Sequence, residues 1–157
     1  MSADPATSQD VTASLSNAAD YANAARILRA EKRVDDADAM LSDGIERFPE
    51  HIGLAIDYCS AAMDRHEWSE ALQRWERLQR AFPNELRGYI GAALALRELK
   101  KCEEGEARLL AAIDRFPEHP HPPIHYASFA QHRGDLSEAL RRWERVRRRF
   151  PVPRCWE

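Results

Sequence analysis

The sequence predicts an all-α fold, a right-handed superhelical solenoid built from four helix-turn-helix repeats of 34 residues. The stretch SEALQRWERLQRAFP, which begins at Ser69, returns as SEALRRWERVRRRFP at Ser137 with 11 of 15 residues identical. Its apolar residues follow at spacings of one, three and four, which places them on one face of a helix. The dipeptide Phe-Pro recurs every 34 residues, at Phe48-Pro49, Phe82-Pro83, Phe116-Pro117 and Phe150-Pro151.

Each repeat is expected to contain two helices joined by a turn. The second helix begins at a capping side chain, Asp35 in the first repeat, Ser69 in the second and Ser137 in the fourth. In the fourth repeat, Pro122 and Pro123 suit the first turn of the first helix. Each Phe-Pro ends a second helix, because proline disfavours helix in the residue before it. The repeats are 18–51, 52–85, 86–119 and 120–153, and one residue of each is expected to plug the turn: Val34, Trp68, Cys102 and Leu136.

The two ends of the chain lie outside the repeats. Residues 1–17 show no apolar periodicity and are rich in Ser, Thr, Ala and Asp, which favours a disordered N-terminal tail. Residues 154–157 form a short C-terminal tail. There is no secretory signal and no apolar run near the ~20 residues that span a bilayer, so we expect a cytoplasmic protein that does not bind membranes.

A 34-residue helix-turn-helix unit that ends in proline resembles the tetratricopeptide repeat (TPR), in the style of bacterial arrays. The family's final proline is matched by Pro49, Pro83, Pro117 and Pro151. Its small residue in the second helix is matched by Ala37, Ala71, Gly105 and Ala139, and the aromatic residue four positions later by Trp75 and Trp143. The resemblance implies a solenoid whose first helices line a concave groove that holds peptides.

This resemblance implies a non-enzymatic interaction module or adaptor that binds a segment of a partner protein. Four groove arginines, Arg26, Arg29, Arg87 and Arg97, predict a preference for acidic segments. The opposing interpretation is that isoleucines such as Ile56 are packing residues rather than partner contacts. The expected partner-binding residues are Asn23, Arg26, Arg29, Ile56, Asp57, Ser60, Met63, Arg87, Ile90, Leu94, Arg97, His121, Ile124, His125, Ser128 and Gln131.

Two other clusters suggest chemistry of their own. Arg141, Arg142, Arg145, Arg148 and Arg149 are expected on the outer face of the last helix, as solvated charges, a docking surface for an acidic partner or a phosphate-binding patch. The net charge of −3 opposes a nucleic-acid partner. His121, His125 and His132 could share one helical face, but no carboxylate or thiolate joins them as metal ligand, so a polar lining is expected.

The sequence contains no catalytic motif and no phosphate-cradling glycine loop, so we predict no enzyme activity, no cofactor and no metal. Solenoids usually need a capped end, and the last helix pair is expected to expose apolar surface, to which Cys155 and Trp156 of the C-terminal tail add. A continuing polypeptide, a homodimer or a partner could each cover that end. The alternative function is a recognition or scaffolding domain of a larger, transferase-type enzyme, since the repeat style is similar to arrays attached to such domains. An RNA-binding helical repeat is the least favoured alternative.

Overall fold

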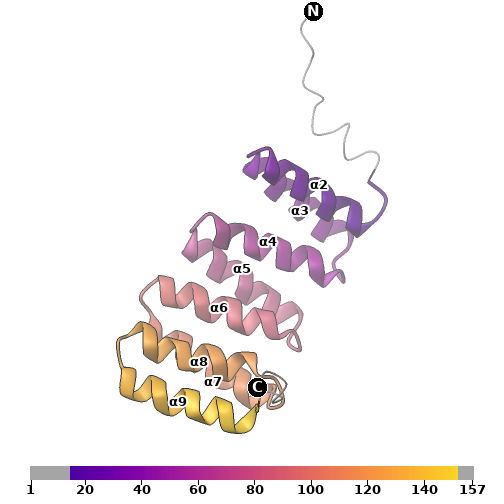
Figure 1. Cartoon of the computed structure of the whole chain (residues 1–157). Coiled ribbons are helices and arrows are strands. Elements are labelled where there is room, and N and C mark those ends of the chain that lie inside the picture. Colours follow the sequence, from indigo (N-terminus) through magenta and orange to yellow (C-terminus); the bar gives the residue numbers. More distant parts are fainter. Residues whose placement is uncertain (1–14, 152–157) are drawn as a thin grey trace, which may run out of the picture. The chain divides into compact units, whose positions relative to one another are not determined.

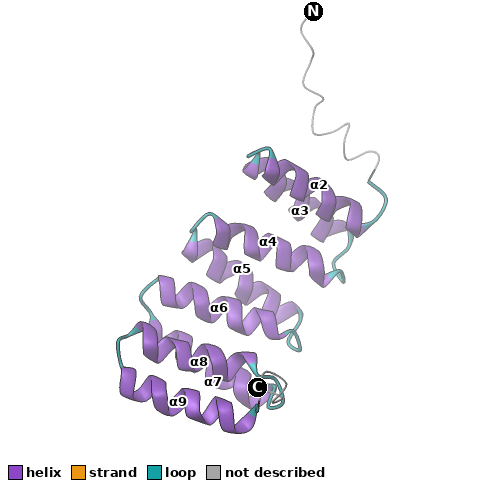
Figure 2. Cartoon of the chain, viewed as in Figure 1, coloured by secondary structure: helices purple, strands orange, loops and turns teal. Residues whose placement is uncertain are grey.

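The computed structural model describes residues 15–151, and every regular element in that range is an α-helix (Figures 1 and 2). The helices divide into two compact units, Met1–Arg65 and His66–Glu157. No helix in the described range is both long and apolar enough to cross a membrane. The first unit holds α2 (Ala18–Ala30), α3 (Val34–Arg47) and α4 (Ile52–Asp64), and the second holds α5 (Trp68–Ala81), α6 (Leu86–Glu98), α7 (Cys102–Arg115), α8 (His121–His132) and α9 (Leu136–Arg149).

The four Phe-Pro dipeptides end the second helices, as predicted. Phe48, Phe82, Phe116 and Phe150 are the C-caps of α3, α5, α7 and α9, each with its backbone N–H bonded to the carbonyl four residues earlier. The proline that follows lacks an N–H and cannot extend the helix. The 34-residue period of the sequence is therefore a period of helix ends.

The second helices begin earlier than the sequence predicts. Asp135 caps α9, because its Oδ1 accepts a hydrogen bond from the backbone N–H of Glu138 at 3.0 Å. Ser137 already lies inside that helix, and Ser69 and Asp35 lie inside α5 and α3, so the predicted caps are wrong.

The predicted turn plug also fails in two repeats. Leu136 is 65% exposed and Val34 is 37% exposed, whereas Trp68 and Cys102 at the equivalent positions are half-buried. The turns instead depend on a left-handed backbone conformation at Lys32, His66, Lys100 and Gly134, which have φ of 63°, 60°, 64° and 80°. These residues are also 34 apart. In three of the turns the next N–H bonds back to the first helix, as in Arg33 to Leu28, Lys101 to Leu96 and Asp135 to Ala130.

The first unit has a core that includes Tyr21, which packs edge-on against Phe48 with ring centroids 6.0 Å apart. Residues 15–17, which the sequence assigns to a disordered tail, are described here: Leu15 packs against this core, and Asn17 caps α2 by accepting from the backbone N–H of Asp20. Residues 1–14 and 152–157, with Cys155 and Trp156, lie outside the described residues.

The second unit depends on close contacts between large and small residues. A Cβ atom on Gly91 of α6 would lie 2.3 Å from the indole ring of Trp75 on α5, so only glycine lets the two helices approach this closely. Gly105 of α7 plays the same part for Phe129 of α8, whose ring would meet an added Cβ at 2.6 Å. Each large ring is buried at its contact.

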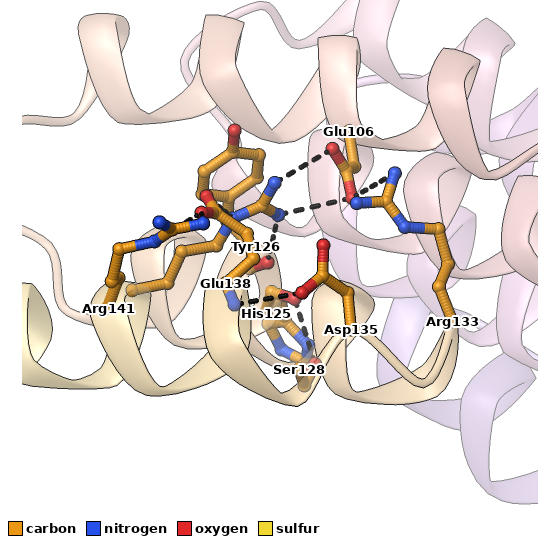
Figure 3. Close-up of polar contacts among 9 residues, drawn as sticks. Glu106, His125, Tyr126, Ser128, Arg133, Asp135, Glu138 and Arg141 are labelled. Atoms are coloured by element: carbon orange, nitrogen blue, oxygen red, sulfur yellow. Dashed lines mark hydrogen bonds and ion pairs between the residues drawn. The ribbon is translucent and has the colours of Figure 1, made fainter.

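A buried arginine, Arg142, ties α9 to α7 and α8, and Figure 3 labels its partners Glu106, Tyr126 and Glu138. Arg142 is only 6% exposed, and its guanidinium lies 3.7 Å from the centroid of the Tyr126 ring. It donates to Glu138 of its own helix at 2.8 Å, to Glu106 of α7 at 3.1 and 3.2 Å, and to the Tyr126 carbonyl at 2.8 Å. Arg133 adds a second ion pair to Glu106, at 3.2 Å.

This network corrects the sequence-based placement of Arg142, which we expected on the outer face. The position points inward because Tyr126 offers a ring face and Glu106 and Glu138 offer charge compensation. The same residue types recur 68 positions earlier, at Tyr58, Glu70 and Arg74, and Arg74 is likewise buried with Glu70 bonded to it.

Replacing Gly91 with alanine should destabilise the second unit. Alanine normally stabilises a helix relative to glycine by up to about 1 kcal/mol, but here the added Cβ forces the buried Trp75 ring to move, at a cost of about 1–3 kcal/mol. The midpoint of urea unfolding, followed by circular dichroism, measures this. Gly53→Ala is the control, because its Cβ meets only the imidazole of His51. If both variants shift the midpoint equally, the close contact has no energetic role, whereas rescue of Gly91→Ala by Trp75→Phe supports it.

Removing the charge of Arg142 should destabilise the second unit more than removing any exposed arginine of α9. Arg142→Met leaves Glu106 with Arg133 only, and we expect a loss of about 2–3 kcal/mol, against less than about 0.5 kcal/mol for the exposed Arg145→Met. Thermal unfolding of the two variants measures the difference, and equal melting temperatures would contradict the network.

The same variant should also lose part of its acid sensitivity. The hydrogen bond from Arg142 is the main reason that the pKa of Glu138 is lowered, so this carboxylate stabilises the fold above pH 4.5 and loses that contribution as the pH falls through the folded pKa. Arg142→Met should therefore flatten the fall in stability at acid pH.

Candidate partner-binding surfaces

The first unit has a hollow of about 280 Å³ between its two first helices, α2 and α4. Asn23, Arg26 and Arg29 of α2 line it, and Asp57 of α4 lies on the other side. All four were predicted partner-binding residues, so the fold brings them together. Ala22, Ala25 and Leu41 supply the apolar floor. A polar rim over an apolar floor is a common composition of protein-recognition surfaces.

The charges of this hollow are partly compensated within the unit. Arg29 forms an ion pair with Asp64 of α4, and the Arg26 guanidinium reaches the Asn23 side chain at 3.4 Å. Arg26 is exposed and has no ion pair among residues 15–151. It is therefore the groove arginine of this unit that is available to a carboxylate.

The remaining predicted residues of α4 differ in exposure. Ile56 is buried, so it supports the packing of the chain and offers no exposed surface. Ser60 and Met63 are half-buried. The opposing interpretation of the isoleucines thus describes Ile56.

In the second unit, α6 and α8 are neighbouring first helices with an apolar strip along them. Ile90 and Leu94 of α6 are half-buried and pack against the core cluster formed by Ala93, Leu109 and Phe129. Ile124 of α8 is also half-buried. These side chains serve the core and the surface at the same time, and together they form an apolar strip.

Polar and basic groups flank this strip. His121 is exposed and His125 half-buried on α8, and the Arg97 guanidinium lies 5.7 Å from the centroid of the Phe129 ring. Burial lowers the pKa of His125 below its usual 6.5, and the nearby His121 and Arg97 lower it further. His125 is therefore mostly neutral at pH 7. Ser128 donates to the His125 carbonyl at 2.8 Å, and Gln131 is exposed at the end of α8.

The two arginines of α6 hold carboxylates of their own unit. Arg87 donates through Nε to Glu85 at 2.7 Å, and this bond is the main reason that the pKa of Glu85 is lowered. Arg97 pairs with Glu98 at 2.9 Å. Three of the four predicted groove arginines, Arg29 among them, are thus already paired, which the sequence could not indicate.

The arginine run of α9 divides into one buried and several exposed residues. Arg142 is buried, whereas Arg141, Arg145, Arg148 and Arg149 are exposed. Arg141 pairs with Glu138 at 2.8 Å, and Arg148 approaches Glu144 at 4.0 Å. The burial of Arg142 could have been predicted from the sequence, because Arg74 and Tyr58 lie 68 positions before Arg142 and Tyr126. An arginine exposed to solvent needs no tyrosine that recurs with it.

Within the described range, no group of three or more His, Cys, Asp or Glu side chains is arranged to hold a metal ion. His121 and His125 are neighbours on α8, and His132 is exposed at the last position of that helix.

Solved structures with the same arrangement of helices are TPR proteins. No protein-family model and no curated protein matches the sequence. TTC0263, a thermophilic TPR protein of Thermus thermophilus, has a TM-score of 0.70 at 17% identity, over 91% of this chain and 79% of its own. YrrB, described as a TPR protein with an unusual peptide-binding site, has a TM-score of 0.63 at 17% identity, over 95% and 77%. MamA of Desulfovibrio magneticus RS-1 has a TM-score of 0.66 at 18% identity, over 83% and 73%. Eight helices in pairs, four Phe-capped helix ends and these likenesses give one conclusion for the described residues: the chain has the tetratricopeptide-repeat fold.

Proposed function

We propose that the chain is a non-enzymatic interaction module that binds a segment of a partner protein along its first helices. The observation that carries this proposal is the hollow between α2 and α4, where exposed polar side chains surround an apolar floor. In the second unit, the apolar strip of α6 and α8, with His121, His125 and Gln131 beside it, is a candidate surface of its own for a partner segment. The peptide-binding site named for YrrB is consistent with this use of the fold.

The preference for acidic segments rests on fewer residues than the sequence suggests. Arg29, Arg87 and Arg97 already hold carboxylates, so each would have to exchange an internal ion pair for one with the partner. Arg26 needs no exchange. We therefore assign the main contact with a partner carboxylate to Arg26, with His125 contributing when protonated.

Other parts of the proposal are independent of the groove. Leu136 and Leu140 of α9 are 65% and 66% exposed, so a homodimer would have an apolar surface there to cover. An adaptor of this kind would act in the cytoplasm. A recognition domain of a larger transferase-type enzyme and an RNA-binding repeat stay alternative predictions that no contact in the described range favours.

Charge reversal at Arg26 tests the groove. The partner is captured from an extract of the source cells and identified by mass spectrometry, and its affinity is then measured by calorimetry. Arg26→Glu should weaken binding by about tenfold, the effect of losing one charge-assisted hydrogen bond. Arg80→Glu, an exposed arginine on the second helix α5, is the matched control and should leave the affinity unchanged. Equal effects of the two variants would place the binding surface elsewhere.

Acidification should strengthen binding of an acidic segment, because His125 gains a proton only below pH 6.5 and then adds positive charge beside His121 and Arg97. Affinity measured at decreasing pH, above the acid range in which the partner's carboxylates titrate, should rise in the wild type and rise less in His125→Asn. His132→Asn on the same helix is the control. The free energy of unfolding decreases in this pH range, because His125 binds its proton more readily in the unfolded chain than in the folded one. The folded state is therefore checked at each pH. A rise of equal size in His125→Asn would remove this residue from the site.

A further inference from the structure

A second hollow, of about 140 Å³, lies in the second unit between α7, α8 and α9, away from the groove residues. Leu110 and Ile113 of α7 and Val146 of α9 form its apolar walls, and Pro123 of α8 closes it on a third side. Arg145 and Arg149 of α9 stand at its rim. The proposed function uses none of these residues.

The hollow exists because proline replaces tyrosine. One repeat earlier, Tyr89 occupies the position that corresponds to Pro123. The Tyr89 ring packs edge-on against Phe116 with centroids 5.5 Å apart, and the Tyr89 hydroxyl donates to the Pro83 carbonyl at 3.3 Å. Phe150, which corresponds to Phe116, lines the hollow with no such partner from Pro123. The smaller ring leaves the space beside Phe150 unfilled.

An exposed leucine makes one wall of the hollow. Leu110 is 45% exposed, and the corresponding residues of the other repeats are polar: Ser42, Glu76 and Glu144. Of the four equivalent positions, only the one that lines the hollow therefore carries an apolar side chain. Ile113 and Val146, both half-buried, continue the apolar surface inward.

The rim carries positive charge that the unit does not neutralise. Arg145 has no ion pair with any residue in the range 15–151, and Arg149 donates to the Pro117 carbonyl at 2.6 Å instead of to a carboxylate. The two acidic residues of α9 are engaged elsewhere, Glu138 with Arg141 and Arg142 and Glu144 near Arg148. An anionic group beside the hollow would therefore meet two guanidinium groups that pair with no carboxylate of the described range.

We propose that this hollow receives one large apolar side chain from an acidic segment of a partner protein, whose carboxylates pair with Arg145 and Arg149. Its volume is close to that of an apolar cavity of about 150 Å³ that accommodates benzene, so an aromatic ring or a leucine side chain fits. Arginine is suited to the carboxylates because its planar guanidinium binds them at two points. The site goes beyond the proposed groove and gives the second unit an independent contact.

The test uses the whole chain and the synthetic pentapeptide Glu-Glu-Phe-Glu-Glu, followed by NMR of methyl groups. Binding should shift the methyl signals of Leu110, Ile113 and Val146, with saturation in the millimolar range. The groove is reported separately by Ile90, Leu94 and Ile124, so failure of the hollow and failure of the groove are distinguishable. A peptide with alanine in place of phenylalanine should bind the hollow more weakly.

Four variants, one of them a control, decide the assignment. Arg145→Glu should weaken binding by about fivefold or more, whereas Arg77→Glu, the corresponding exposed residue 68 positions earlier on α5, should not. Pro123→Tyr should fill the hollow and abolish the shifts, and Leu110→Ser, which places the residue of the first repeat there, tests the same wall without adding volume. The proposal is overturned if the methyl groups of Leu110, Ile113 and Val146 do not respond, if the alanine peptide binds equally, or if Arg77→Glu has the effect of Arg145→Glu.

Discussion

The second unit depends on how closely α5 and α6 can approach each other, and that distance is set by one indole ring on one glycine. Trp75 is large and buried, and Gly91 has no side chain to hold it away. Phe129 on Gly105 repeats the principle between α7 and α8. Because a repeat cannot bury its apolar face alone, these contacts bring successive helices together and thereby position the α6 and α8 side chains that form the candidate surface.

Some arginines of this chain are paired with carboxylates of the fold, and others are not. The buried Arg142 guanidinium lies over the Tyr126 ring, and Glu106 and Glu138 neutralise its charge. One member of the arginine run on α9 therefore joins two repeats. Of the predicted groove arginines, Arg29 links α2 to α4 through Asp64, whereas Arg87 and Arg97 pair with the nearby Glu85 and Glu98. A count of basic residues therefore overstates the positive charge that a ligand meets.

The fold could be predicted from the sequence because its signal is a period, and periods survive local substitutions. The ends at Phe48, Phe82, Phe116 and Phe150 follow from proline chemistry. The first residues of the second helices could not be predicted in the same way. Asp135 and Ser137 are both residue types that can cap α9, and only the backbone geometry decides between them. The membership of the candidate site was predicted in part: Asn23, Arg26 and Asp57 line one hollow, whereas the burial of Ile56 and the pairing of Arg87 depend on neighbours distant from any motif.

The left-handed turn residues have an evolutionary consequence. Only Gly134 has the residue type that this conformation favours; Lys32, His66 and Lys100 each carry a side chain at a cost of roughly 1–2 kcal/mol. The array carries this cost three times, and glycine at those turns would remove it. Lineages of this chain could exchange these residues for glycine and use the gained stability to accept destabilising changes on the binding faces, which would let partner preference diverge while the 34-residue period stays fixed.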